Sequence, residues 1–229
     1  MLLCWPVTVL EGETGADPAA GGGFAVVSEL EPVGAVVGRP GDGVVARAAE
    51  LLAARRREHP AEILAQPEDA EAVARALPGW GRDGATLHTL GGPAEPPALR
   101  PDAEVALIAP SERHRLPPDG IPPPVWREIE PTWERGRPVA VAFVDGRPAS
   151  FCLGTLETET LWDVSIETLE PYRHQGLAAA CFVALRRHYR ELAKQPVWGA
   201  HHSNPASLRL ARRLGFVPAA RLEIFIQPG

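Results

Sequence analysis

The chain has 229 residues, which allows one large domain or two small ones, and its 45% hydrophobic and 23% charged residues are typical of a globular protein. Its net charge of −6, without a block of basic residues, argues against nucleic acid as the main partner. The apolar runs are too short to span a membrane, and the first ten residues lack a basic segment. We therefore expect a cytoplasmic protein that contacts neither nucleic acid nor membrane.

The cysteines and histidines give no sign of a disulfide framework or a metal site. The three cysteines, Cys4, Cys152 and Cys181, are odd in number and lie within apolar runs, as buried thiols do. The seven histidines include one adjacent pair, His201 and His202, and no spacing of Cys or His suits zinc. We expect reduced thiols in the core and no metal cofactor.

Clusters of proline and glycine divide the first hundred residues into short elements. We expect strands at residues 24–27, 34–37 and 85–90, and helices at residues 44–57 and 67–77. None of these elements carries a motif for chemistry. The cluster at residues 91–97 has the composition of a linker, which predicts a small N-terminal α/β domain over 1–98 and a second domain over 99–229.

The second domain opens with short apolar segments and one helix. Apolar patterns predict strands at 105–109, 139–144, 149–156 and 161–168, and a helix at 122–133. Pro131 should kink or split that helix, and Asp145-Gly146 favours the positive φ of a tight hairpin turn. After residue 168 we expect a helix over 177–192, a strand at 197–200, a helix from Pro205, and two last strands at 216–217 and 222–226.

The segment from 161 to 192 carries the clearest chemistry. Polar and β-branched residues alternate over 161–168, Pro171 ends the strand, and a polar run leads to Gly176, where helical spacing begins. The start of such a helix offers unpaired N–H groups and the positive end of the helix dipole to an anion. Arg173 adds a charge suited to a pyrophosphate, and small Ala178 keeps the first turn uncrowded.

A second segment, residues 203–216, reads as a short capped helix. Asn204 and Pro205 are the preferred residue types for an N-cap and a first helical position, and Gly215 suits a left-handed stop. This explanation of Asn204 is complete without a ligand.

Taken together, the two segments resemble the signatures of the GNAT acyltransferase superfamily. Residues 173–178, Arg-His-Gln-Gly-Leu-Ala, resemble its pyrophosphate loop, and the run from Asn204 to Leu214-Gly215-Phe216 looks like its second signature, in the same order. The resemblance covers roughly the last 130 residues. It implies an α/β (α+β) fold with a mixed, mostly antiparallel central sheet flanked by helices.

The resemblance also implies acetyl-CoA as co-substrate, with no metal, and an amine acceptor on a small molecule or peptide. The residues that it would place against the cofactor are Ile166, Thr168, Arg173, His174, Gln175, Gly176, Leu177, Ala178, Asn204 and Ser207. Asp163 and Glu167 are the carboxylates from which a catalytic base would come, Asp163 first. Many relatives carry a tyrosine acid at the position of Ala211, which has no proton to give.

Two questions stay open at this stage. The protein is either an N-acetyltransferase that works by direct attack of the amine in a ternary complex, or a non-catalytic acyl-CoA-binding module. Residues 1–98 are a packing or dimerisation domain, which would make a homodimer, or a wall of the acceptor pocket, or a degenerate second copy of the acyltransferase fold.

Overall fold

The computed structural model describes residues 24–27, 37–38, 62–65, 70–92, 102–157 and 160–226, which fall into two compact units. The first unit holds the described residues of 89–198 together with 210–217. The second holds those before residue 89 together with 199–209 and 218–226. The two units interleave along the chain, and the domain division at residue 98 stays a prediction. The expected helix at 44–57 and Cys4 lie outside the described residues.

The first unit is built on a mixed sheet in which β9, β8, β7, β6 and β5 are neighbours in that order. These strands are β5 (Ala103–Ile108), β6 (Val139–Val144), β7 (Arg147–Glu157), β8 (Leu161–Thr168) and β9 (Gln195–His201). β5 to β8 pair antiparallel, whereas β8 and β9 pair parallel. The predicted hairpin is confirmed: Asp145 and Gly146 have φ of 49° and 71°, as a tight turn between β6 and β7 needs.

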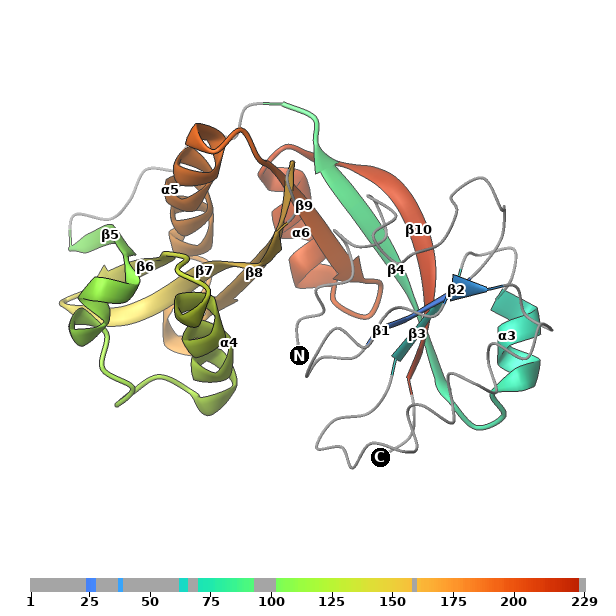
Figure 1. Cartoon of the computed structure of the whole chain (residues 1–229). Helices are drawn as coiled ribbons and strands as arrows, with labels where there is room; N and C mark the ends of the chain where they lie inside the picture. The colour runs from blue at the N-terminus through green and yellow to red at the C-terminus, as the bar shows by residue number, and fades with distance from the viewer. Residues whose placement is uncertain are drawn as a thin grey trace. The chain divides into compact units, whose positions relative to one another are not determined.

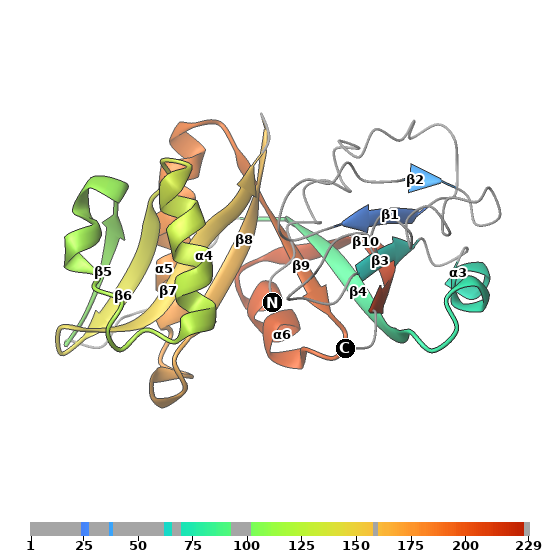
Figure 2. The ribbon, with the colours of Figure 1, turned by 60° about the horizontal axis from the view of Figure 1, so that its bottom comes forward.

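Two helices cover opposite faces of this sheet, α4 (Pro123–Glu134) and α5 (Leu177–Glu191) (Figures 1 and 2). On the α4 side, alternate residues of β6 such as Val141 pack with Ile129 and Trp133 in a buried core. On the α5 side, Trp162 of β8 stacks on Tyr189 with ring centroids 4.3 Å apart. Because side chains alternate along a strand, the neighbours of Trp162 in β8 face α4.

Two short 3-10 helices, Pro110–Arg115 and Glu170–Tyr172, connect the elements of this unit. Cys152 and Cys181 are free and buried, which confirms that part of the expectation about the thiols. Burial raises the pKa of both thiols, that of Cys181 to about 12, so both are neutral at physiological pH.

Two details of the predicted elements differ in the structure. α4 runs unbroken through Pro131, which lies in its last turn, so the proline does not split the helix; the hydroxyl of Thr132 there donates to the carbonyl of Glu128 at 2.7 Å. The last two expected strands form a single strand, β10 (Phe216–Ile226). Its middle residues, 217–221, are mostly exposed, and they therefore lack the apolar pattern by which a strand is recognised in the sequence.

The second unit contains a further sheet region with neighbours in the order β2, β1, β3, β10 and β4. Its elements are β1 (Phe24–Val27), β2 (Val37–Gly38), β3 (Glu62–Ala65), α3 (Ala70–Ala76) and β4 (Gly81–Leu90). β1 pairs antiparallel with β2 and β3, and β3 pairs antiparallel with β10. The helix α6 (Pro205–Arg213) has residues in both units.

Candidate active site

Strand β8 pairs with β7 along its length, but it pairs with β9 only at its start. With β7 it pairs as far as Thr168, which lies opposite Ser150. With β9 the described pairs end at Asp163, opposite Val197. From residue 164 onward, the backbone groups that point away from β7 are therefore outside the β9 ladder, and Ile166 and Thr168 lie in this stretch. Such an edge can pair with the amide groups of an extended ligand.

The start of α5 follows this edge after a short loop. Gly176 is the N-cap, with φ of 80° in the left-handed region, and no side chain caps the helix. The first amide that bonds within the helix is that of Ala180, which donates to the carbonyl of Gly176 at 3.1 Å. The first amides of an α-helix have no partner in the preceding turn, so this end suits an anion. A glycine also lets such an anion approach the backbone closely.

The remaining loop residues predicted to contact the cofactor differ in exposure. His174 is exposed and has φ of 64°, an uncommon value for a residue with a side chain, while Gln175 donates to the carbonyl of Pro171 at 3.3 Å. Leu177 is 1% exposed, so its side chain packs in the core. Ala178 is half-buried and adds no bulk to the first turn.

Arg173 and Glu167 contact each other beside the loop. The Arg173 guanidinium donates from Nε to the carbonyl of Thr168 at 3.2 Å, and its Nη2 lies 3.6 Å from Oε1 of Glu167. The same Oε1 accepts the backbone N–H of Thr168 at 3.2 Å. Glu167 is thus the partner of an exposed arginine, an ordinary structural role. The structure brings Arg173 next to the start of α5 by holding it against the end of β8.

Asp163 is buried, with 3% of its surface exposed, on the face of the sheet that α4 covers. The hydroxyl of Thr155 on β7 donates to its Oδ2 at 2.9 Å. The pKa of Asp163 is raised to about 8, mainly by burial and also by the negative charge of Glu128, against the lowering effect of the Thr155 hydrogen bond. At neutral pH this carboxyl is mostly protonated, and it becomes a base as the pH passes about 8.

Glu128, like Thr155, lies near Asp163 and was not predicted from the sequence. It comes from α4, and its Oε2 accepts a hydrogen bond of 2.7 Å from the hydroxyl of Ser165, two residues after Asp163 on the same face of β8. A signal was present in the sequence. Glu128 falls at helical spacing among Val125, Ile129 and Thr132, which are all buried, so an acid shares the core-facing side of α4.

Other arrangements in the described part of the chain do not suggest a different chemistry. No group of three or more His, Cys, Asp or Glu side chains there could hold a metal ion. Asp83 accepts hydrogen bonds from both His201 and Ser203, so the histidine does not link the serine to the carboxylate as a nucleophilic triad requires. Among the described helices, none is long and apolar enough to cross a membrane.

Comparison with known proteins finds a matching family model for part of the chain. Residues 130–225 match the family model described as GNAT acetyltransferase. These residues, which are less than half of the chain, are similar to the GNAT acetyltransferase family. The match includes β8, the loop, α5 and α6, the elements formed by the two segments that carry the resemblance. No curated protein matches the sequence.

Solved structures share the fold of this chain at low sequence identity. A GCN5-related N-acetyltransferase-like protein from Streptococcus suis is 13% identical, with a TM-score of 0.63 over 99% of this chain and 100% of that one. A GCN5-related N-acetyltransferase from Kribbella flavida is 17% identical, with a TM-score of 0.62 over 91% and 88%. A tandem GNAT protein from the clavulanic acid biosynthesis pathway is 16% identical, with a TM-score of 0.56 over 91% and 80%. The expected mixed, mostly antiparallel sheet with flanking helices is thereby confirmed.

The predicted cap at the start of residues 205–213 is present. Asn204 precedes α6, and its Oδ1 accepts the backbone N–H of Ser207 at 3.1 Å. Both residues belong to the second compact unit, and a contact of either with the cofactor stays a prediction. Ala211, at the position where many relatives have a tyrosine, is fully buried in α6.

Proposed function

We propose that this protein is an N-acetyltransferase that transfers the acetyl group of acetyl-CoA to an amine of a small molecule or peptide by direct attack in a ternary complex. The observation that carries the proposal is the uncapped start of α5 at left-handed Gly176, beside the guanidinium of Arg173. This combination of unpaired amides, helix dipole and fixed cation fits the pyrophosphate of acetyl-CoA. The family of residues 130–225 supports the same reaction class.

Acetyl-CoA, when bound, supplies an acyl group activated as a thioester. The residues of this chain would hold it in three ways. The start of α5 and Arg173 would bind the diphosphate, and the edge of β8 beyond Asp163 would pair with the amides of the pantetheine arm. A backbone N–H of the same strand would polarise the thioester carbonyl. Holding both reactants in line supplies much of the rate increase expected of such an enzyme.

Asp163 is the group that we propose as proton acceptor from the ammonium form of the amine. An effective general base has a pKa near the working pH, and the pKa of about 8 for Asp163 meets this condition. Glu128 adds a negative charge on the same side of the sheet, which favours an approaching ammonium. Glu167 ranks behind both, because it already pairs with Arg173.

Isothermal titration of CoA against the whole chain tests the binding site. We expect Arg173→Glu to repel the diphosphate and Gly176→Trp to block its approach, so both should weaken CoA binding at least about tenfold. Arg187→Glu is the matched control, since it changes the charge equally but lies on the exposed side of α5, about 15 Å from its start. Undiminished affinity in both site variants would show that the diphosphate binds elsewhere.

Release of CoA thiol from acetyl-CoA with a panel of amines, aminoglycosides and peptide N-termini tests the reaction. Turnover with any member supports the transferase. Tight CoA binding with no turnover on every acceptor would instead favour the acyl-CoA-binding module.

A further inference from the structure

The end of β7 next to Asp163 departs from regular strand geometry. The register between β7 and β8 shifts between Gly154 and Glu157, which indicates a bulge. A bulge leaves backbone groups without ladder partners and re-aims the side chains beside it. The bulge begins next to Thr155, whose hydroxyl donates to Asp163. The direction of that hydroxyl therefore depends on how the bulge is held.

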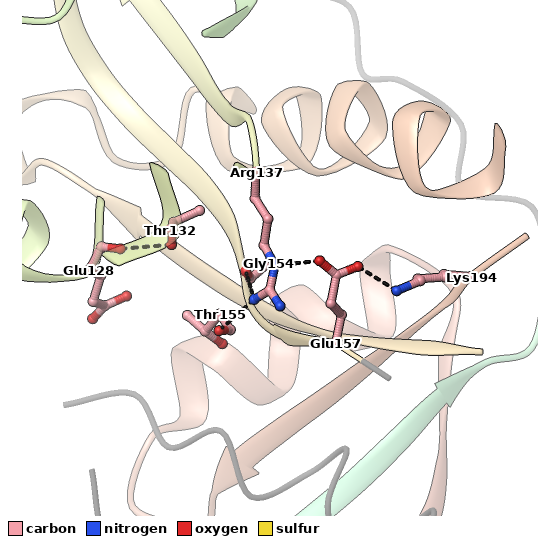
Figure 3. Close-up of polar contacts among 7 residues, drawn as sticks. All are labelled: Glu128, Thr132, Arg137, Gly154, Thr155, Glu157 and Lys194. Atoms are coloured by element: carbon pink, nitrogen blue, oxygen red, sulfur yellow. Dashed lines mark hydrogen bonds and ion pairs between the residues drawn. The ribbon is translucent and has the colours of Figure 1, made fainter. Parts of the chain in front are cut away.

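Arg137 holds this bulge. It lies between α4 and β6, and its Nη1 donates to the carbonyl of Thr155 at 3.0 Å and to that of Gly154 at 3.4 Å (Figure 3). The guanidinium also forms an ion pair with Glu157, which in turn pairs with Lys194 at 2.6 Å. Figure 3 shows the guanidinium lying between the two carbonyls and the Glu157 carboxylate. A single side chain thus ties together both ends of the irregular segment.

The opposite side of the bulge is fixed by packing. A Cβ atom placed on Gly154 would lie 2.7 Å and 2.9 Å from the ring atoms Cζ and Cε2 of Tyr189. Since no real Cβ comes so close, the tyrosine ring occupies the space where a side chain would be. With Tyr189 against one face and Arg137 on the carbonyls, residue 155 has little freedom to move.

Stability alone does not explain why charged groups occupy this position. The side chains of Arg137, Glu157 and Lys194 are between 13% and 18% exposed. The free energy needed to remove such charged groups from water often exceeds the free energy gained from their mutual attraction. Well-packed apolar residues at the same positions can stabilise the fold as much as the ion pairs do. Unlike an apolar side chain, however, a guanidinium fork binds two carbonyls in a defined direction.

From these contacts we infer that Arg137 and Thr155 are positioning residues for Asp163. Arg137 fixes the backbone of the bulge, and Thr155 transmits that position to the carboxyl through its hydroxyl. The inference rests on the role proposed above for Asp163. The groups that act on this carboxyl are the Thr155 hydroxyl of β7, the Glu128 carboxylate of α4 and the Val164 backbone of its own strand.

Titration of the Asp163 carboxyl carbon by NMR in the whole chain tests this link without any substrate, with Asp163→Asn to assign the signal. The hydrogen bond from Thr155 lowers the pKa of Asp163. Thr155→Val, which keeps the shape but removes the hydroxyl, should therefore raise the pKa, and Thr155→Ser should restore it. Arg137→Met should shift the pKa in the same direction as Thr155→Val. Lys194→Met, which leaves the carbonyl contacts in place, is the control and should leave it unchanged.

Turnover with any accepted amine supplies the second measurement. Arg137→Met should lower kcat about tenfold with KM for acetyl-CoA little changed, but should have almost no further effect in the Asp163→Asn background. Should Arg137→Met fail to fold, Arg137→Lys, which keeps the charge but not the fork, takes its place.

Several outcomes would overturn the inference. One is that Asp163 titrates with the same pKa in wild type and in Thr155→Val. Another is that Arg137→Met lowers kcat by the same factor in the wild-type and Asp163→Asn backgrounds. If the wild-type protein did not bind CoA, the proposed function would be contradicted, but the effect of Thr155 on the pKa of Asp163 would still hold.

Discussion

Ser165 of β8 donates a hydrogen bond of 2.7 Å to Glu128 of α4, across 37 residues of sequence. The contact fixes an acidic side chain on the same face of the sheet as Asp163. Two carboxyls held close together cannot both ionise easily, so one of them keeps its proton to a higher pH. Here the negative charge of Glu128 is one of the causes that raise the pKa of the buried Asp163.

Replacing Glu128 by glutamine should lower the pKa of Asp163 from about 8, because it removes the negative charge that disfavours a second one. The pH at which turnover rises should fall with it. NMR titration of the Asp163 carboxyl measures the first effect, and a pH–rate profile the second. Glu130→Gln is the matched control, since Glu130 lies on the same helix and is exposed. A pKa that is equal in Glu128→Gln and wild type would refute the coupling.

Asp163 should also make folding stability depend on pH. Its folded pKa of about 8 lies above the ordinary 3.8, so between these values the folded state binds the proton more tightly than the unfolded state. The free energy of unfolding should therefore fall as the pH rises from about 4 to about 8, by at most on the order of 5 kcal/mol. Above that range the loss is complete.

Asp163→Asn should abolish most of this dependence, because the amide does not titrate. Urea unfolding at pH 5 and pH 9 measures it, with Asp145→Asn in the exposed hairpin turn as control. At pH 9, Asp163→Asn should raise the free energy of unfolding relative to wild type more than the control Asp145→Asn does. If wild type were as stable at pH 9 as at pH 5, the buried carboxyl would not be costly to ionise.

Local patterns in the sequence were sufficient to predict the elements for which we propose cofactor binding. The alternation over 161–168 predicted β8 with the bounds that the structure has, and Gly176 marked the start of α5. The cap at Asn204 was also predicted, because capping depends on neighbouring residues. Each of these features is specified within a few positions of the chain.

The acceptor side of the site could not be predicted in the same way. Glu128 reaches Ser165 only because α4 packs on the sheet, and Arg137 reaches Thr155 only because β7 bulges there. Both contacts join segments far apart in sequence, and local patterns carry no distance between such segments. The raised pKa of Asp163 likewise follows from burial, which the whole sheet and α4 create together.

Gly154 should tolerate no side chain while Tyr189 keeps its hydroxyl. Gly154→Ala brings a methyl group into the ring of Tyr189 and should lower the free energy of unfolding by about 1–3 kcal/mol. In the Tyr189→Phe background the loss should be smaller, because the oxygen that the methyl group meets first is gone. Urea unfolding of the two single variants and the double variant measures the difference. Gly92→Ala is the control, because no atom lies near the added methyl group. If the losses of the two single variants simply added in the double variant, this account would be contradicted.

Ala211 cannot serve as a general acid, and we expect that neither Tyr172 nor Tyr189 takes that role. Tyr189 lies on the α5 face of the sheet, opposite Asp163, with 1% of its surface exposed, and its hydroxyl has no hydrogen-bond partner among the described residues. Burial, followed by the charge of Glu157, raises its pKa above that of an ordinary phenol, which makes it a weaker acid. Tyr172 lies in the short 3-10 helix before Arg173 and is half-buried.

Tyr172→Phe and Tyr189→Phe should therefore each keep most of the wild-type kcat with any accepted amine. A thiol with a pKa near about 8.5 can leave as thiolate near neutral pH, so the reaction does not require a proton donor. Tyr189→Phe should also unfold at no lower urea concentration than wild type, because it removes a buried hydroxyl that bonds to nothing described. Steady-state kinetics measure kcat for each variant, and titration with CoA checks that binding is intact. A loss of kcat of about a hundredfold or more in either variant, with folding and CoA affinity intact, would place the acid on that tyrosine.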